Sequence, residues 1–302
     1  MTLTELQEQF AMPGVLSFEE TPTGMIYVEV KTTAATATVF LQGAHLTQWQ
    51  PAGQEPVLFL SRTSEFVRGK AIRGGVPISF PWFAADKKTD RVNGKPGPSH
   101  GFARMEDWTL AFAALAGDDV HLTFTLGSTA LSREMGFDQF RVAYVLTIGR
   151  ALTMKLTVVN DATTALVFEE ALHTYFAVGD IRETTLTGLE ATGYSDKTDG
   201  FAMKPAADAP LSFTKETDRI YNHTAATCVI HDGLNKRRIV VEKTNSDTTV
   251  VFNPWKAMAD LGADQWHEML CVETVNAAES PVTLQPGESH TMQAHLSLEG
   301  GA

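Results

Sequence analysis

The sequence predicts an all-β protein built from large antiparallel sheets. Apolar and polar residues alternate over residues 140–148, and after Gly149 and Arg150 the alternation resumes over residues 152–158. A period of two places every second side chain on one face of a strand, so these runs predict a hairpin of two long strands. Convincing helical periodicity is confined to the first ten residues. Many strands at short spacing, with few helices, favour a large sandwich or barrel.

Shorter alternating runs repeat this pattern elsewhere in the chain. They lie at residues 25–30, 120–126, 239–241 and 292–298, and turn residues such as those at 285–288 separate them. The segment richest in glycine and proline, residues 93–98, is predicted to be an ordered functional loop. Because the sequence has no internal repeat and no linker-like stretch, we expect one domain over residues 1–302.

The composition predicts a globular protein, with 43% hydrophobic and 20% charged residues. A formal net charge of −12 argues against a nucleic-acid or anionic-membrane surface. The sequence lacks the apolar run of about 18 residues that a membrane span needs, and the first ten residues do not resemble a secretory signal. Cys228 and Cys271 lie in separate apolar runs, which favours buried thiols over a disulfide. We therefore expect a cytoplasmic protein that acts as a monomer.

The positive charges are concentrated in one part of the chain. Between Arg62 and Arg104 there are nine basic and three acidic residues, so this segment carries six net positive charges in an acidic protein. A locally basic segment of this kind indicates a small anionic ligand rather than a polyanion, although a solvated charged loop would have the same composition.

Several common catalytic signatures are absent from the sequence. It has no GxGxxG, no GxxxxGK, no GxSxG and no paired-cysteine zinc spacing. Glu170 and His173 are three residues apart, which would suit two metal ligands on a helix. Their surroundings favour a strand, however, where positions three apart face opposite ways. We therefore expect no metal site from this pair.

Four short segments combine apolar strand residues with isolated polar ones. They are residues 71–82, 99–104, 172–176 (followed by 194–197) and 271–276. A single histidine in such a strand is more often a hydrogen-bonded core residue, and a buried arginine more often belongs to a structural ion pair. Glu273 is harder to explain structurally, because a carboxylate in so apolar a strand needs partners or a cavity.

Together these segments resemble the aldose 1-epimerase superfamily, and within it the branch of hexose-6-phosphate mutarotases. The resemblance extends along the chain through IRGG at 72–75, HGFAR at 100–104, LHTYF at 172–176 and VET at 272–274. Residues 43–47, 218–221 and 252–255 also fit that branch. Each motif alone is moderately specific, whereas all of them in this order identify the family.

The resemblance implies a galactose-mutarotase-like β-supersandwich with an open cleft, a small sugar phosphate as the substrate and no cofactor. The implied roles are general acid for His173, general base for Glu273, sugar contacts for Arg73, His100 and Asp196, and a phosphate contact for Arg104. One position departs from the family pattern, because Trp82-Phe83 is followed by Ala84-Ala85 where a glycine is expected. This departure leaves open whether Lys87 or Lys88 contacts the substrate.

The chemistry of anomer exchange explains why an acid and a base are needed. Opening a cyclic hemiacetal requires a proton delivered to the ring oxygen and another removed from the C1 hydroxyl. A protonated imidazole and a carboxylate can do both, and reversing their roles closes the ring. As an anion, Glu273 would favour the charged form of His173 and so keep the acid protonated near neutral pH.

Three other functions fit parts of this pattern. An aldose 1-epimerase acting on unphosphorylated sugar would need the same pair but not the basic segment. Glycoside cleavage needs two closely spaced carboxylates, and we find no second acid in a context like that of Glu273. A non-catalytic sugar-binding module would need no titrating pair, so its binding would show a flat pH profile.

Overall fold

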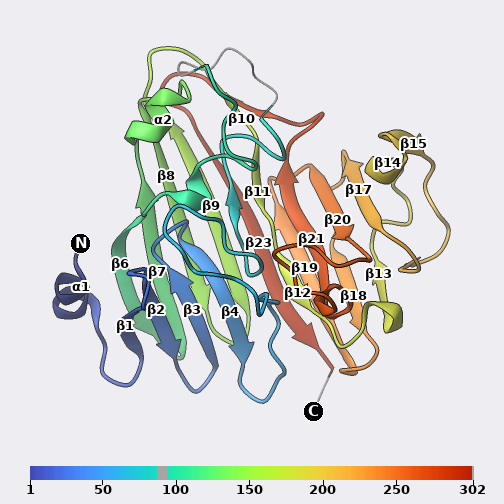
Figure 1. Cartoon of the computed structure of the whole chain (residues 1–302), viewed down its shortest axis with the longest axis horizontal. Coiled ribbons are helices and arrows are strands. Elements are labelled where there is room, and N and C mark those ends of the chain that lie inside the picture. Colours follow the sequence, from blue (N-terminus) through green and yellow to red (C-terminus); the bar gives the residue numbers. More distant parts are fainter. Residues whose placement is uncertain (87–93, 301–302) are drawn as a thin grey trace.

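The computed structural model describes residues 1–86 and 94–300, and within them the strands form four antiparallel sheets (Figure 1). The predicted all-β class is therefore confirmed. A nine-stranded sheet has the order β16 (Leu211–Ser212), β13 (Thr184–Thr187), β18 (Cys228–Asp232), β19 (Arg237–Thr244), β23 (Ser289–Glu299), β9 (Leu152–Asn160), β8 (Phe140–Ile148), β7 (Asp119–Leu126) and β6 (Thr109–Ala116). The predicted hairpin is β8 and β9, which pair from Phe140 with Asn160 to Ile148 with Leu152.

The other sheets are smaller. The eight-stranded sheet has the order β15 (Ala202–Lys204), β14 (Tyr194–Asp196), β17 (Thr217–Asn222), β20 (Thr248–Asn253), β21 (Met269–Asn276), β11 (Glu170–Leu172) and β5 (Ile78–Ser79), with β12 (Tyr175–Ala177) also paired to β21. The four-stranded sheet consists of β1 (Leu16–Glu20), β2 (Ile26–Lys31), β3 (Ala35–Phe40) and β4 (His45–Pro51). The fourth sheet pairs β10 (Leu166–Phe168) with β22 (Val282–Leu284).

Helices are short in the described part of the chain. The predicted N-terminal helix is α1 (Leu3–Phe10), which Thr2 and Glu5 cap reciprocally and which buries Leu6 and Phe10. A five-residue helix, α2 (Ala130–Glu134), was not predicted, because it is too short to show a helical period. The 3₁₀ turns are η1 (Ala103–Met105), η2 (Ile181–Glu183), η3 (Lys197–Asp199) and η4 (Gln265–Glu268). None of the described helices is long and apolar enough to cross a membrane.

The sheets pack around one large buried cluster of apolar side chains that includes residues from Leu6 to Leu296. The four-stranded sheet contacts the nine-stranded one, since the Trp49 indole on β4 donates to the carbonyl of Gly149 at the β8–β9 turn (3.0 Å). The eight-stranded sheet contacts it too, since Arg237 on β19 donates to the carbonyl of Ala177 on β12 (2.8 Å). A single domain over residues 1–302 would require a continuous core of this kind. The assignment of the whole chain to one domain stays a prediction.

Strand β21 has two different faces, and this difference positions the site. Leu270 and Val272 belong to the main core between the sheets. Cys271 and Val275 belong instead to smaller apolar clusters, which lie on the opposite face because successive side chains of a strand alternate. Glu273 follows this alternation and therefore lies on the same face as Cys271, away from the main core.

Candidate active site

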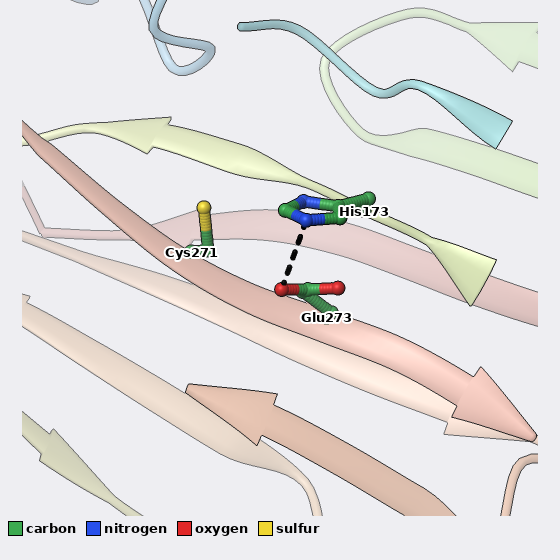
Figure 2. Close-up of side chains that lie close together, drawn as sticks. All are labelled: His173, Cys271 and Glu273. Atoms are coloured by element: carbon green, nitrogen blue, oxygen red, sulfur yellow. Dashed lines mark ion pairs between the residues drawn. The ribbon is translucent and has the colours of Figure 1, made fainter. Parts of the chain in front are cut away.

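The backbone of three strands brings His173 and Glu273 together. His173 lies between β11 and β12, which both pair with β21: Leu172 is opposite Thr274, and Tyr175 is opposite Cys271. This register places His173 level with Glu273, and the His173 amide donates to the carbonyl of Pro77 (3.1 Å). His173 Nε2 is 3.4 Å from Glu273 Oε1 (Figure 2). The predicted acid and base are therefore neighbours, although 100 residues separate them in the sequence.

Both residues of the pair line a cavity of about 410 Å³. His173 is 8% exposed and Glu273 is 2% exposed. The ring of Tyr175 stacks on that of His173, with centroids 5.0 Å apart. A hollow of about 480 Å³ elsewhere runs along the four-stranded sheet, but neither histidine nor arginine lines it. A cavity of this size with converging ionisable groups is the usual form of a small-molecule site.

Burial sets the protonation of the pair and corrects one expectation. Burial lowers the pKa of His173 well below its ordinary value, and the charges of Arg104 and Arg73 act in the same direction. Burial also raises the pKa of Glu273 well above its ordinary value. Burial therefore acts against the charged pair that we expected, because removing two charges from water has a cost that their attraction must offset. Its direction is toward a neutral imidazole beside a protonated carboxyl.

His100, predicted as a sugar contact, lies in the cavity wall next to His173, with ring centroids 5.0 Å apart. The amide of Ala84 donates to His100 Nδ1 (3.3 Å), and burial lowers the pKa of His100 to about 3. The ring is therefore neutral, and its proton is on Nε2 because Nδ1 is an acceptor. His100 can thus donate one hydrogen bond to a bound hydroxyl.

Ala84 explains the departure from the family pattern. Its backbone has φ of 60°, in the left-handed region that glycine occupies most easily. An alanine here costs about 1 kcal/mol more than a glycine would. This conformation lets both the amide and the carbonyl of Ala84 contact His100. The His100 amide donates to the carbonyl of Ala84 (2.6 Å). The loop therefore keeps a glycine-like turn despite the alanine.

Arg73 also lines the cavity, but its guanidinium already has two partners. Nε and Nη2 both donate to Asp260 Oδ2, at 2.9 and 2.6 Å, and Nη1 donates to the Tyr175 hydroxyl at 2.8 Å. No sequence pattern indicated this contact, because Arg73 and Asp260 are 187 residues apart. Through Tyr175, Arg73 is linked to the face of His173.

Arg104 lies close to this group without lining the cavity itself. Its Nη2 donates to the carbonyl of Ser99 (2.6 Å), while its Nε is buried and has no hydrogen-bond partner in the described structure. Burial lowers the pKa of Arg104, and the charge of Arg73 contributes in the same direction. The Arg104 guanidinium therefore lies near Arg73, which lines the cavity. Lys87 and Lys88 lie outside the described residues.

Asp196 does not line the cavity, although its neighbours Ser195 and Lys197 do. Its carboxylate accepts hydrogen bonds from the amide and hydroxyl of Thr198 at the start of η3. A sugar contact by Asp196 stays a prediction. The cavity wall contains instead an ion pair between Lys197 and Asp218 (2.7 Å), which we did not single out from the sequence.

Cys271 is a further residue of the site that sequence reasoning missed. Both cysteines are free and buried, as predicted, but Cys271 lies beside the His173–Glu273 pair (Figure 2). The sequence did contain one indication of this position. Cys271 is two residues from Glu273, and residues two apart on a strand lie on the same face. Glu170, in contrast, turns toward other residues: it accepts a hydrogen bond from Asn276 (2.9 Å) and contacts His290 (3.0 Å).

Comparison with known proteins agrees with this fold and site. Residues 27–297 match the model of the aldose 1-epimerase family, so the chain belongs to that family. It is 34% identical over 262 residues to a protein of Escherichia coli K12 named "Putative glucose-6-phosphate 1-epimerase", and the match covers 85% of each chain. A protein of the same name from Cenchrus ciliaris is 31% identical and is covered over 86% of its length.

Among solved structures, one described as "a putative mutarotase" from Salmonella typhimurium superposes with a TM-score of 0.86 at 32% sequence identity. The superposition covers 96% of this chain and 95% of the other. The predicted galactose-mutarotase-like architecture is therefore confirmed. A galactose 1-epimerase from Lactobacillus acidophilus has the same fold at 14% identity, with a TM-score of 0.72.

Proposed function

We propose that this protein interconverts the α and β anomers of a hexose 6-phosphate, and that glucose 6-phosphate is its first substrate candidate. The observation that carries the proposal is the contact between His173 and Glu273 in the wall of a cavity that Arg73 also lines and that Arg104 lies close to. The family and the names of its relatives support the same reaction. The basic segment between Arg62 and Arg104 supports a phosphorylated substrate over a free sugar.

The pair exchanges two protons with the substrate. In the proposed reactive form His173 is protonated and Glu273 is ionised. The two side chains still share one proton, which has moved from Glu273 to His173 across the 3.4 Å contact. His173 then protonates the ring oxygen while Glu273 removes the proton of the C1 hydroxyl. The bond between C1 and the ring oxygen breaks and leaves an open-chain aldehyde.

Anomer exchange follows from rotation and closure. The aldehyde group turns about the C1–C2 bond and presents its other face to the hydroxyl group that was formed from the ring oxygen. His173 takes the hydroxyl proton back and Glu273 returns its proton to the new C1 oxygen, so the pair ends as it began. One acid and one base contribute about 10²–10⁴-fold each, which suits a reaction that also proceeds unaided. This scheme needs no cofactor.

A coupled assay tests the proposal. Freshly dissolved α-glucose 6-phosphate is supplied to a β-specific dehydrogenase, and the protein is expected to increase the rate above that of spontaneous mutarotation. A parallel assay on α-glucose tests the nearest alternative, an aldose 1-epimerase of unphosphorylated sugar. A higher rate on glucose would favour that alternative, and the absence of any rate increase would favour a non-catalytic sugar-binding module.

The pH dependence of the rate is expected to be bell-shaped. The active pair carries one proton, and burial disfavours the form with two because it lowers the pKa of His173. The acid limb should therefore lie below 6.5, the ordinary histidine value. Burial of Glu273 raises its pKa, so the base limb should lie well above the ordinary value of 4.5. Both limbs belong to the pair rather than to one residue.

This profile is measured as kcat at saturating substrate, because the substrate phosphate itself titrates near pH ~6. Exchange between the anomers, followed by magnetic resonance, avoids the pH range of a coupling enzyme. An acid limb at or above the ordinary histidine value would mean that burial does not lower the pKa of His173 in the enzyme–substrate complex.

The same proposal includes a monomeric, cytoplasmic protein that binds neither nucleic acid nor membrane. Arg73, His173 and Glu273 of one chain line the same cavity, two buried free thiols suit a reducing compartment, and the net charge is −12.

A further inference from the structure

We propose that His173, Cys271 and Glu273 form an inhibitory site for a thiophilic divalent cation, of which Zn²⁺ is the first candidate. One ligand atom from each of the three side chains lies within 4.8 Å of the other two. Imidazole nitrogen, thiolate sulfur and carboxylate oxygen are the three donor types that zinc uses in proteins. Three protein ligands with a fourth position open are also the usual form of an accessible zinc site.

The geometry needs only small side-chain movements to close around an ion. Zinc lies about 2.0–2.3 Å from such donors, so the ligand atoms of a tetrahedral site are about 3.5 Å apart. The His173–Glu273 contact is already 3.4 Å. Cys271 and Glu273 project from the same face of β21, and the His173 ring lies over Glu273 and beside the Cys271 sulfur (Figure 2). In the described structure Glu273 Oε2 is buried without a hydrogen-bond partner, so the carboxylate has acceptor capacity that the fold does not use.

Cys271 has no part in the proton exchange proposed above. Its side chain is fully buried and packs with Phe59, Tyr175 and Met269 on the cavity side of β21. Glu273 and His173 line the cavity, whereas Cys271 does not. A cation would therefore reach the sulfur from the cavity, past the two residues that act on the sugar.

Occupation of this site would stop the reaction. The ion would take the lone pairs of His173 and Glu273, and neither residue could then accept or donate the substrate's protons. It would also occupy the end of the cavity where the C1 atom must lie. The cation-binding site rests on the geometry alone, while the inhibition rests in addition on the proposed function.

Zinc titration of the metal-free full-length protein tests the proposal. Competition with a chromophoric indicator is expected to show one tightly bound Zn²⁺ per chain, and the mutarotation rate should fall in parallel and recover when a chelator is added. Cys271→Ser should weaken zinc binding at least about tenfold, since even the loss of a residue that supports a ligand costs 10–100-fold. Each variant's inhibition is expressed relative to its own metal-free rate.

Cys228→Ser is the matched control. Cys228 is also a buried free thiol, but it lies on β18 in the main core, so zinc binding should be unchanged in this variant. Co²⁺ provides a measurement on the unmodified protein, which does not depend on whether a variant folds. Its bond to Cys271 should give a thiolate charge-transfer absorption. The exposed His223, which contacts Asp247 and Glu279, has no sulfur beside it, so cobalt bound there would not give that absorption.

The outcomes separate the two proposals. Equal zinc affinity in Cys271→Ser and Cys228→Ser, or cobalt binding without the thiolate band, would overturn the cation site. Zinc binding that depends on Cys271, in a protein that accelerates no anomer exchange, would uphold the cation site and refute the proposed function.

Discussion

His173→Asn and Glu273→Gln are each expected to lower kcat for glucose 6-phosphate mutarotation by at least about 100-fold. Each substitution removes one half of the proton exchange while keeping a side chain of similar shape. Because the two residues act as a unit, the double variant should be little slower than the slower single variant. The rates are measured by the coupled assay, with the spontaneous reaction subtracted.

Folding should survive both substitutions. Burial favours the neutral form of Glu273, and glutamine resembles that form, so Glu273→Gln leaves no unpaired charge in the site. His121→Asn is a matched control, since His121 lies on β7 of the other sheet and contacts Thr147. Near-normal rates in a folded His173 or Glu273 variant would exclude that residue from the mechanism.

Arg104→Ala is expected to lower kcat/KM for glucose 6-phosphate by about one to two orders of magnitude. A hydrogen bond to a charged group contributes about 1.5–3 kcal/mol, and 1.4 kcal/mol corresponds to about tenfold. The rate on free glucose should change much less, because that substrate has no phosphate. Arg104→Lys should restore only part of the loss, since an ammonium group lacks the planar fork of arginine.

Arg68→Ala is the control for a general effect of the basic segment. Arg68 belongs to the same segment, but it is exposed and pairs with Asp107 at 2.8 Å. If Arg104→Ala lowered both activities equally, Arg104 would be structural or would contact the sugar ring. The phosphate contact would then be sought at Arg73, or at Lys87 and Lys88.

The long strands were predictable because their side chains alternate between core and surface over many residues. The hairpin of β8 and β9 is confirmed for this reason. Strands β5 and β11 are only two and three residues long, so they contain no usable period. β11 forms because it pairs with β21, and β5 forms because it pairs with β11. Pairing between residues so far apart in the chain is not visible in a local sequence pattern.

The candidate site shows the same limit. The proximity of His173 and Glu273 followed from motif resemblance, whereas their protonation did not, because burial is a property of the folded chain. The contact of Arg73 with Asp260 likewise depends on the loop after β20, in which no motif includes Asp260. Chemical identity was thus predictable, while electrostatic environment required the assembled sheets.

The reacting pair and the residues around it belong to different kinds of structure. Glu273 lies within β21 and His173 directly follows β11, so the spacing of the pair depends on backbone pairing in a sheet. Arg104, Lys197 and Asp260 lie in short turns or loops. Turns accept substitution and insertion far more readily than paired strands do. A duplicated gene could therefore acquire a new sugar preference through changes in these turns, while selection on the strands preserved the inherited chemistry.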